Sequence, residues 1–98
     1  MQNKRIRLRF LSTMRHIVGE NEKVIEISKE ATIGDLLRLI LTTYGKKMTT
    51  FLFEEDNKSV RNDILILIND VDMDVLEGLD TVLSEEDEVT LMPIAHGG

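Results

Sequence analysis

Hydrophobic and polar residues alternate along residues 4–10, and the alternation returns along residues 23–28. A period of two residues is typical of a strand with one face in a hydrophobic core. A Gly-Glu-Asn turn at residues 19–21 separates the two segments, so they predict a β-hairpin. The first segment sets Ile6, Leu8 and Phe10 on one face against Arg5, Arg7 and Arg9 on the other. We interpret the arginines mainly as a solvated face, with a docking patch for an acidic surface as the alternative.

Residues 33–44 carry apolar side chains at the three- and four-residue spacing of a helix with one buried stripe. Thr32 precedes this segment as a helix N-cap, with Asp35 at the capping-box position, and Gly45 follows at the C-terminal end. We assign the stripe to the hydrophobic core. Its members are Ile33, Leu36, Leu37, Ile40, Leu41 and Tyr44. Residues 46–62 are of mixed polarity and predict a long loop or a short second helix.

The apolar run at residues 64–68 predicts a central strand. If its isoleucines face the helix, Leu65 and Leu67 face outward, where they and Met92 form a candidate partner-docking patch. The alternative is ordinary surface exposure of apolar residues. A turn at residues 69–70, an irregular or briefly helical stretch at 76–83, and a last strand at 88–92 with Val89 and Leu91 inward complete a ββαββ order.

Composition narrows the class of protein. A chain of 98 residues with 42% hydrophobic and 31% charged residues fits one globular domain. The net charge of −6 opposes stand-alone nucleic-acid binding and favours a basic protein partner. The absence of cysteine excludes disulfides and thiolate chemistry. No run approaches the ~18 apolar residues of a membrane span, and we expect a cytoplasmic protein.

The sequence ends in His96-Gly97-Gly98. Because glycine has no side chain and tolerates most backbone angles, a Gly-Gly end can enter a narrow channel and present an unhindered carboxylate. We therefore expect residues 1–93 to form the folded domain and residues 94–98 a flexible C-terminal tail. His96 could hydrogen-bond inside a partner's channel, or be a plain exposed imidazole. An inert, frayed terminus is the alternative for the whole segment.

Other motifs give no support for a cofactor or a metal. Asp70, Asp72 and Asp74 imitate the start of a calcium-binding loop, but Val75 and Thr81 stand where that loop needs Gly and Glu. The sequence also contains no glycine-rich phosphate-binding loop. We expect no catalytic residue, no bound metal and no cofactor in this chain.

The element order and several short motifs resemble the ubiquitin-related modifier family of ubiquitin-like sulfur carriers. The motifs are Leu-Ile-Asn-Asp at residues 67–70, Asp72, Leu-Glu-Gly at 76–78 and Ala-His-Gly-Gly at 95–98. Archaeal small modifier proteins and the ThiS and MoaD carriers are related to this family. The resemblance implies an α+β, ubiquitin-like β-grasp fold, in which a mixed sheet of four to five strands packs on one main helix. Glu86 departs from the family, which usually has Gly in the turn before the last strand.

The resemblance further implies a protein co-substrate rather than an enzyme. A ubiquitin-activating-type enzyme would adenylate Gly98 with ATP, and a sulfurtransferase would convert it to a thiocarboxylate. The sulfur would go to the wobble uridine of transfer RNA, and the activated end can also be conjugated to lysines of target proteins. Gly97 would give the tail its reach.

Two alternatives remain at this point. One is a MoaD-like small subunit of molybdopterin synthase, which inserts its tail into a large subunit and donates sulfur in molybdenum or tungsten cofactor biosynthesis. The other is a non-catalytic β-grasp interaction module with an inert tail.

Overall fold

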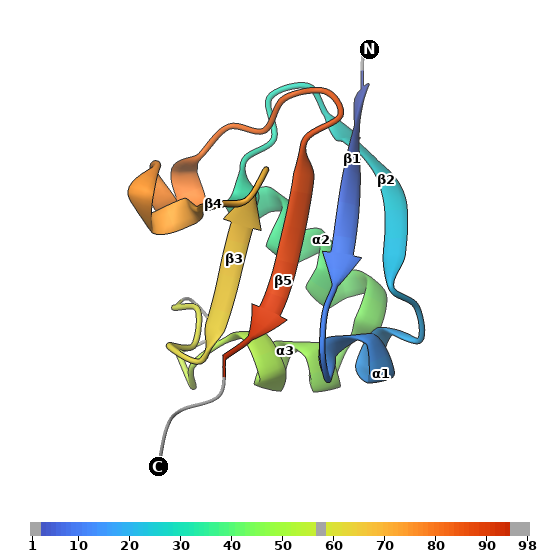
Figure 1. Ribbon diagram of the computed structural model, residues 1–98, viewed down its shortest axis with the longest axis vertical. Helices are drawn as coiled ribbons and strands as arrows, with labels where there is room; N and C mark the ends of the chain where they lie inside the picture. Colours follow the sequence, from blue (N-terminus) through green and yellow to red (C-terminus); the bar gives the residue numbers. More distant parts are fainter. Residues whose placement is uncertain (1–2, 57–58, 95–98) are drawn as a thin grey trace.

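The computed structural model describes residues 3–56 and 59–94 (Figure 1). One mixed sheet has the strand order β2-β1-β5-β3-β4, and α2 crosses one of its faces (Figure 1). The strands are β1 (Asn3–Phe10), β2 (Glu22–Ser28), β3 (Ile64–Ile68), β4 (Val71–Asp72) and β5 (Glu88–Pro93). The helices are α1 (Met14–Val18), α2 (Ile33–Tyr44) and α3 (Lys46–Leu52), followed by the 3-10 turns η1 (Met73–Val75) and η2 (Gly78–Asp80). The predicted mixed sheet on one main helix is confirmed.

The first and last strands lie side by side in the middle of the sheet. β1 and β5 pair in parallel, with Arg7 opposite Glu88 and Phe10 opposite Leu91, whereas every other strand pair is antiparallel. Because β5 runs in the direction of β1, its carboxyl end lies at the opposite end of the molecule from the start of β1 (Figure 1). The chain beyond Pro93 therefore starts from that end.

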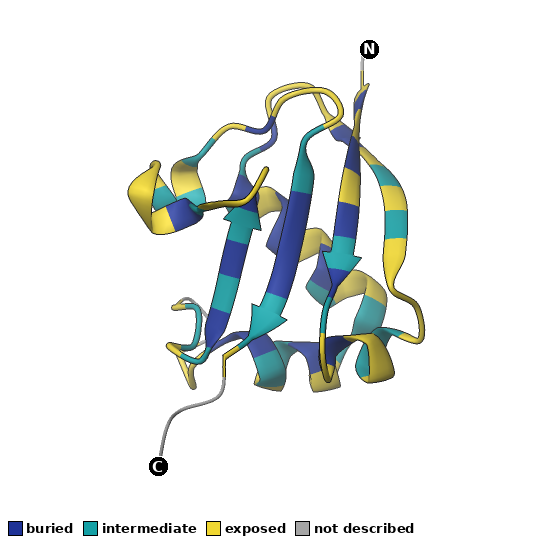
Figure 2. Cartoon of the chain, viewed as in Figure 1, coloured by how far each residue is buried: buried dark blue, intermediate teal, exposed yellow. Residues whose placement is uncertain are grey.

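One hydrophobic core fills the space between the sheet and α2. Side chains on the inner faces of β1, β3 and β5 are buried together with the stripe of α2, as the periodicity predicts. The predicted members that are buried are Ile6, Leu8, Phe10, Ile33, Leu36, Leu37, Ile40, Ile64, Ile66, Ile68, Val89 and Leu91, while Leu41 and Tyr44 are partly buried. Thr90, on the opposite face of β5, is also only 3% exposed, so the middle of β5 is covered on both faces (Figure 2).

The start of α2 is held by the predicted capping box. The Thr32 hydroxyl accepts a hydrogen bond from the Asp35 N–H (3.2 Å), and the Asp35 carboxylate accepts one from the Thr32 N–H (2.9 Å). These two bonds satisfy backbone donors that the first helical turn leaves open. The Thr32 N–H, together with the Arg38 guanidinium, lowers the pKa of Asp35. At the other end Gly45 has a φ of 81°, and its N–H donates to the Leu41 carbonyl.

The predicted ββαββ order omits three local features. α1 contains five residues and has no side-chain cap, so it is too short to show a helical period. Met14 anchors it in the core, and Gly19 ends it with a φ of 88°. Residues 46–52 form the short helix α3. A short helix and a long loop were the two alternatives predicted for this part of the chain. β4 pairs with β3 through only two residues after the tight turn at Asn69 and Asp70.

Lys4 lies on the inner face of β1, in line with the apolar side chains. The residue is only 5% exposed. Its Nζ donates to the carbonyls of Lys29 (2.7 Å), Ala31 (3.1 Å) and Leu83. A buried ammonium is tolerated when all of its protons are hydrogen-bonded. Lys4 thereby joins β1 to the connection between β2 and α2 and to the segment before β5.

The turn before β5 keeps the backbone shape of a glycine turn without a glycine. Glu86 has a φ of 68°, a region that side chains other than Gly, Asn and Asp rarely occupy. Its N–H donates to the Arg5 carbonyl (2.8 Å), and the Arg5 N–H donates to the Glu85 carboxylate (2.7 Å). Glu86 in place of the usual Gly therefore changes the side chain but not the backbone of the turn, which still forms hydrogen bonds with β1.

Replacing Lys4 by methionine keeps most of the side-chain volume and removes the three donors. We expect Lys4→Met to lower the free energy of unfolding by about 3 kcal/mol, because buried carbonyls lose charged hydrogen-bond donors. Urea unfolding at neutral pH measures this change. The exposed Lys29 provides the matched control, and Lys29→Met should change stability by no more than about 0.5 kcal/mol. Equal stability of the two variants would contradict the role given to Lys4.

Candidate functional site

The end of β5 determines where the C-terminal segment begins. The Ile94 N–H donates to the Asp63 carbonyl (2.8 Å), which extends the pairing of β5 with the chain before β3 by one residue. A backbone contact of this kind leaves no mark in the sequence and could not be predicted from it. Ile94 itself is 42% exposed. The predicted residues His96, Gly97 and Gly98 lie outside the described residues.

The candidate docking residues share the outer face of the sheet. Leu65 stands directly opposite Met92 in the antiparallel register of β3 and β5, and Leu67 stands opposite Thr90. Leu65, Leu67 and Met92 are all half-buried, whereas Ile64, Ile66 and Ile68 point to the core. The structure thus brings the three residues together on the two strands closest to the start of the tail.

The arginine row of β1 lies on the same outer face, on the other side of β5. Arg5 forms ion pairs with Glu85 and Glu86 at 3.9 and 3.2 Å. Arg7 and Arg9 both approach Glu88 of β5, at 3.6 and 3.5 Å. Exposed pairs of this kind contribute little to stability. They neutralise the row, so the apolar cluster of β3 and β5 is bordered by compensated charge, which agrees with the reading of the arginines as a solvated face.

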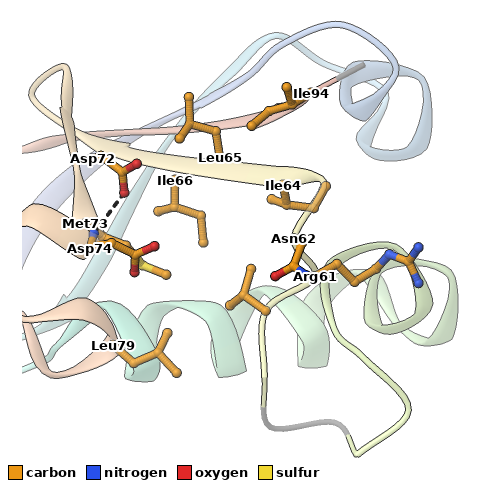
Figure 3. Close-up of a pocket in the computed structure, with 11 residues that line it drawn as sticks. Arg61, Asn62, Ile64, Leu65, Ile66, Asp72, Met73, Asp74, Leu79 and Ile94 are labelled. Atoms are coloured by element: carbon orange, nitrogen blue, oxygen red, sulfur yellow. Dashed lines mark hydrogen bonds between the residues drawn. The ribbon is translucent and has the colours of Figure 1, made fainter. Parts of the chain in front are cut away.

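A cavity of about 370 Å³ opens beside β3 (Figure 3). Ile64 and Ile66 point into it from the strand, and Leu79 points toward them from η2 (Figure 3). Ile94 and Arg61 also line the cavity, so it borders the place where the tail begins. It adjoins the part of β3 that β4 does not cover, since β4 pairs only with Leu67 and Ile68.

The acidic residues beside this cavity have structural contacts. Asp72 accepts a hydrogen bond from the Asp74 N–H (2.8 Å) and so caps η1. Asp63 receives the Arg61 guanidinium at 3.1 Å, which raises the pKa of Arg61. Within residues 3–56 and 59–94, no three His, Cys, Asp or Glu side chains are grouped to hold a metal ion. In the same part of the chain, no helix is long and apolar enough to cross a membrane.

The strand order, the central parallel pair and the single main helix define the ubiquitin-like β-grasp class. Solved structures show the same fold. The solution structure of Urm1 from Trypanosoma brucei superposes with a TM-score of 0.80 at 24% identity, covering 100% of this chain and 99% of that one. CysO in the BexX/CysO complex from Amycolatopsis orientalis gives a TM-score of 0.75 at 20% identity, covering 95% and 99%.

Sequence comparison narrows the class further. The profile of the ubiquitin related modifier family, Urm1, matches residues 5–98. Small archaeal modifier protein 3 of Haloferax volcanii is 30% identical over 93 residues, which cover 95% of this chain and 98% of that protein. This chain therefore belongs to the ubiquitin related modifier family. The β-grasp fold and the family resemblance predicted from the sequence are both confirmed.

Proposed function

We propose that this chain is a ubiquitin-like sulfur carrier and protein modifier whose Gly98 carboxylate is the working group. The family match carries the proposal, because it extends through Gly97 and Gly98. The fold supports it, because β5 carries the chain out of the sheet at a defined end next to Ile94. The protein is a co-substrate rather than an enzyme: other proteins perform the chemistry on its tail.

The chemistry needs an activated carboxyl group. A free carboxylate resists nucleophiles because it is charged and has a poor leaving group. One carboxylate oxygen of Gly98 attacks the α-phosphorus of ATP, pyrophosphate leaves, and an acyl adenylate results. The terminal sulfur of a persulfide on a sulfurtransferase then attacks the acyl carbon and AMP leaves. A second thiol cleaves the remaining S–S bond, which gives a thiocarboxylate on Gly98 and a disulfide on the enzyme.

Each part of the chain has a role in this proposal. Residues 1–93 are the folded body that partners recognise, and residues 94–98 are the tail that enters their active sites. We propose that Gly97 lets the backbone pass a narrow channel and that His96 forms a hydrogen bond within it. Leu65, Leu67 and Met92 dock the activating enzyme, since they form an apolar group on the face next to the tail.

The partners follow from the same reactions. They are an adenylating enzyme of the ubiquitin-activating type, a sulfurtransferase and the final acceptors, in a cytoplasmic setting. The acceptors are the wobble uridine of transfer RNA, for 2-thiolation, and lysines of target proteins. The net charge of −6 opposes direct contact of this chain with RNA, so a separate thiolating enzyme would bind the transfer RNA.

A second candidate is the small subunit of molybdopterin synthase. Pro93, which ends β5, resembles the proline that this type of carrier has before its tail. Such a subunit would form a tight, stoichiometric complex with a large catalytic subunit, and a complex found by co-purification would favour it over the free carrier. A β-grasp interaction module with an inert tail is the remaining alternative. Cellular function that survives deletion of Gly97 and Gly98 would favour that module.

The carrier chemistry changes the mass of the protein. After incubation with ATP, a cognate activating enzyme and a sulfur donor, we expect an intact-mass gain of roughly 16 Da, the exchange of one oxygen for sulfur through covalent activation. Deletion of Gly98 should abolish the gain. If the mass stays unchanged while the same enzymes convert a known carrier, the proposal is wrong.

The docking role of the outer face can be tested separately. Leu65→Asp places a charge in the apolar group while the inner face of β3 stays intact. We expect kcat/KM for ATP-dependent activation to fall at least tenfold, about the effect of losing a central apolar contact. Val75→Asp, at a residue 76% exposed on η1, is the matched control and should leave kcat/KM unchanged. Equal activation of both variants would remove the outer face from the docking surface.

A further inference from the structure

β2 is an edge strand with an open row of backbone groups. The sheet begins with β2 (Figure 1), so within residues 3–56 and 59–94 its only strand neighbour is β1. The Phe10 N–H donates to the Asn21 carbonyl (2.8 Å). Since hydrogen-bonded pairs alternate in an antiparallel ladder, Lys23 and Ile25 direct their backbone groups toward β1. The backbone groups of Val24 and its second neighbours Glu22 and Glu26 therefore point away from the sheet, and they form no hydrogen bond with any described residue.

An apolar groove runs beside this edge, between β2 and α2. Its walls are mostly apolar and consist of Leu8 of β1, Lys23 and Ile25 of β2, and Leu39, Ile40, Thr43 and Tyr44 of α2. The Lys23 ammonium lies 5.6 Å from the centre of the Tyr44 ring. Leu39 is 39% exposed although its side chain is apolar. The Tyr44 hydroxyl is buried and has no hydrogen-bond partner among the described residues, an arrangement that costs free energy unless something occupies the site. The groove has a free volume of about 60 Å³, enough for the end of a side chain.

The charges of the edge indicate what it can pair with. Val24 is 58% exposed, and Glu22 and Glu26 flank it on the same outer face. Within the described part of the chain neither glutamate has a salt-bridge partner. A second copy of this chain, paired antiparallel about Val24, would put Glu22 opposite Glu26 twice. Like charges directly opposite one another destabilise a sheet, so the edge opposes self-pairing and favours a basic strand.

We propose that the β2 edge binds an extended segment of a partner protein by strand addition. The segment has Lys or Arg at its first and fifth positions and three apolar residues between them. Bound antiparallel, its basic residues lie opposite Glu26 and Glu22, and its central residue lies beside Val24. Its second side chain lies opposite Ile25 and enters the groove beside Leu39, and its fourth lies opposite Lys23. Backbone hydrogen bonds to the open row supply affinity, and the two charge pairs supply specificity.

The β2 edge does not include the tail, and it lies on a different strand from Leu65, Leu67 and Met92. The proposal for this edge therefore does not depend on the carrier function. The probe is a synthetic peptide with the core Lys-Ile-Val-Ile-Lys, titrated into the ¹⁵N-labelled full chain. In the free protein the amides of Val24 and Glu26 should exchange with solvent faster than those of Lys23 and Ile25. On binding, Val24 and Glu26 should become protected and shift. Deletion of Gly97 and Gly98 should change neither result.

A charge swap gives the sharpest test. A peptide with Glu in place of both Lys residues should bind the wild-type chain at least about threefold more weakly, and the double variant Glu22→Lys/Glu26→Lys should reverse that preference. Glu54→Lys/Glu55→Lys changes the net charge equally but at a distant loop, and it should keep the wild-type preference. Leu39→Lys should weaken both peptides. Equal binding of the two peptides to the wild-type chain, no binding of either, or shifts confined to other strands would overturn the proposal.

Discussion

The parallel pairing of β1 with β5 is the contact on which the rest of the structure depends. It joins the first and last strands, so it closes the largest loop in the described chain, and closing such a loop carries an entropic cost. Hydrogen bonds from Arg7 to the Asp87 carbonyl and from Leu11 to the Leu91 carbonyl mark its two ends. β2 pairs with β1, β3 pairs with β5, and β4 is attached through β3, while α2 packs on the inner face that β1 and β5 form.

This pairing gives the molecule two different ends. At the end where β1 begins, Lys4 and the Glu86 turn tie the N-terminal strand to the segments before α2 and β5. At the opposite end β5 finishes at Pro93, and only the contact of Ile94 with Asp63 follows among the described residues. One end is therefore closed by internal hydrogen bonds, and the other presents the start of the segment on which the proposed chemistry takes place.

The two proposed partners would bind to different parts of the sheet, one to its outer face and one to its β2 edge. The outer face beside the start of the tail is apolar at Leu65 and Met92, and this is the surface that we propose for the activating enzyme. The β2 edge lies on the far side of the arginine row and offers open backbone groups beside a small, mostly apolar groove. A partner on β2 and an enzyme on β3 and β5 would therefore use separate strands.

Hydrophobic periodicity predicted the elements that are long enough to show a repeating pattern. The strands and α2 span enough residues to show a period, and the capping box at Thr32 and Asp35 marked the helix start correctly. α1 and β4 were missed because five and two residues cannot establish a period. The role of Lys4 was missed because its carbonyl partners are backbone groups that only the fold assembles. The Gly98 chemistry came from family resemblance, since a Gly-Gly pair alone does not specify a reaction.

The central claim is that the Gly98 carboxylate is activated while the folded body is recognised. ATP–pyrophosphate exchange catalysed by a cognate activating enzyme measures that step directly, before any sulfur donor or acceptor is involved. We expect exchange that depends on this chain, saturates with its concentration and disappears when Gly98 is deleted. Exchange that persists without Gly98, or none with an enzyme that activates a known carrier, would contradict it.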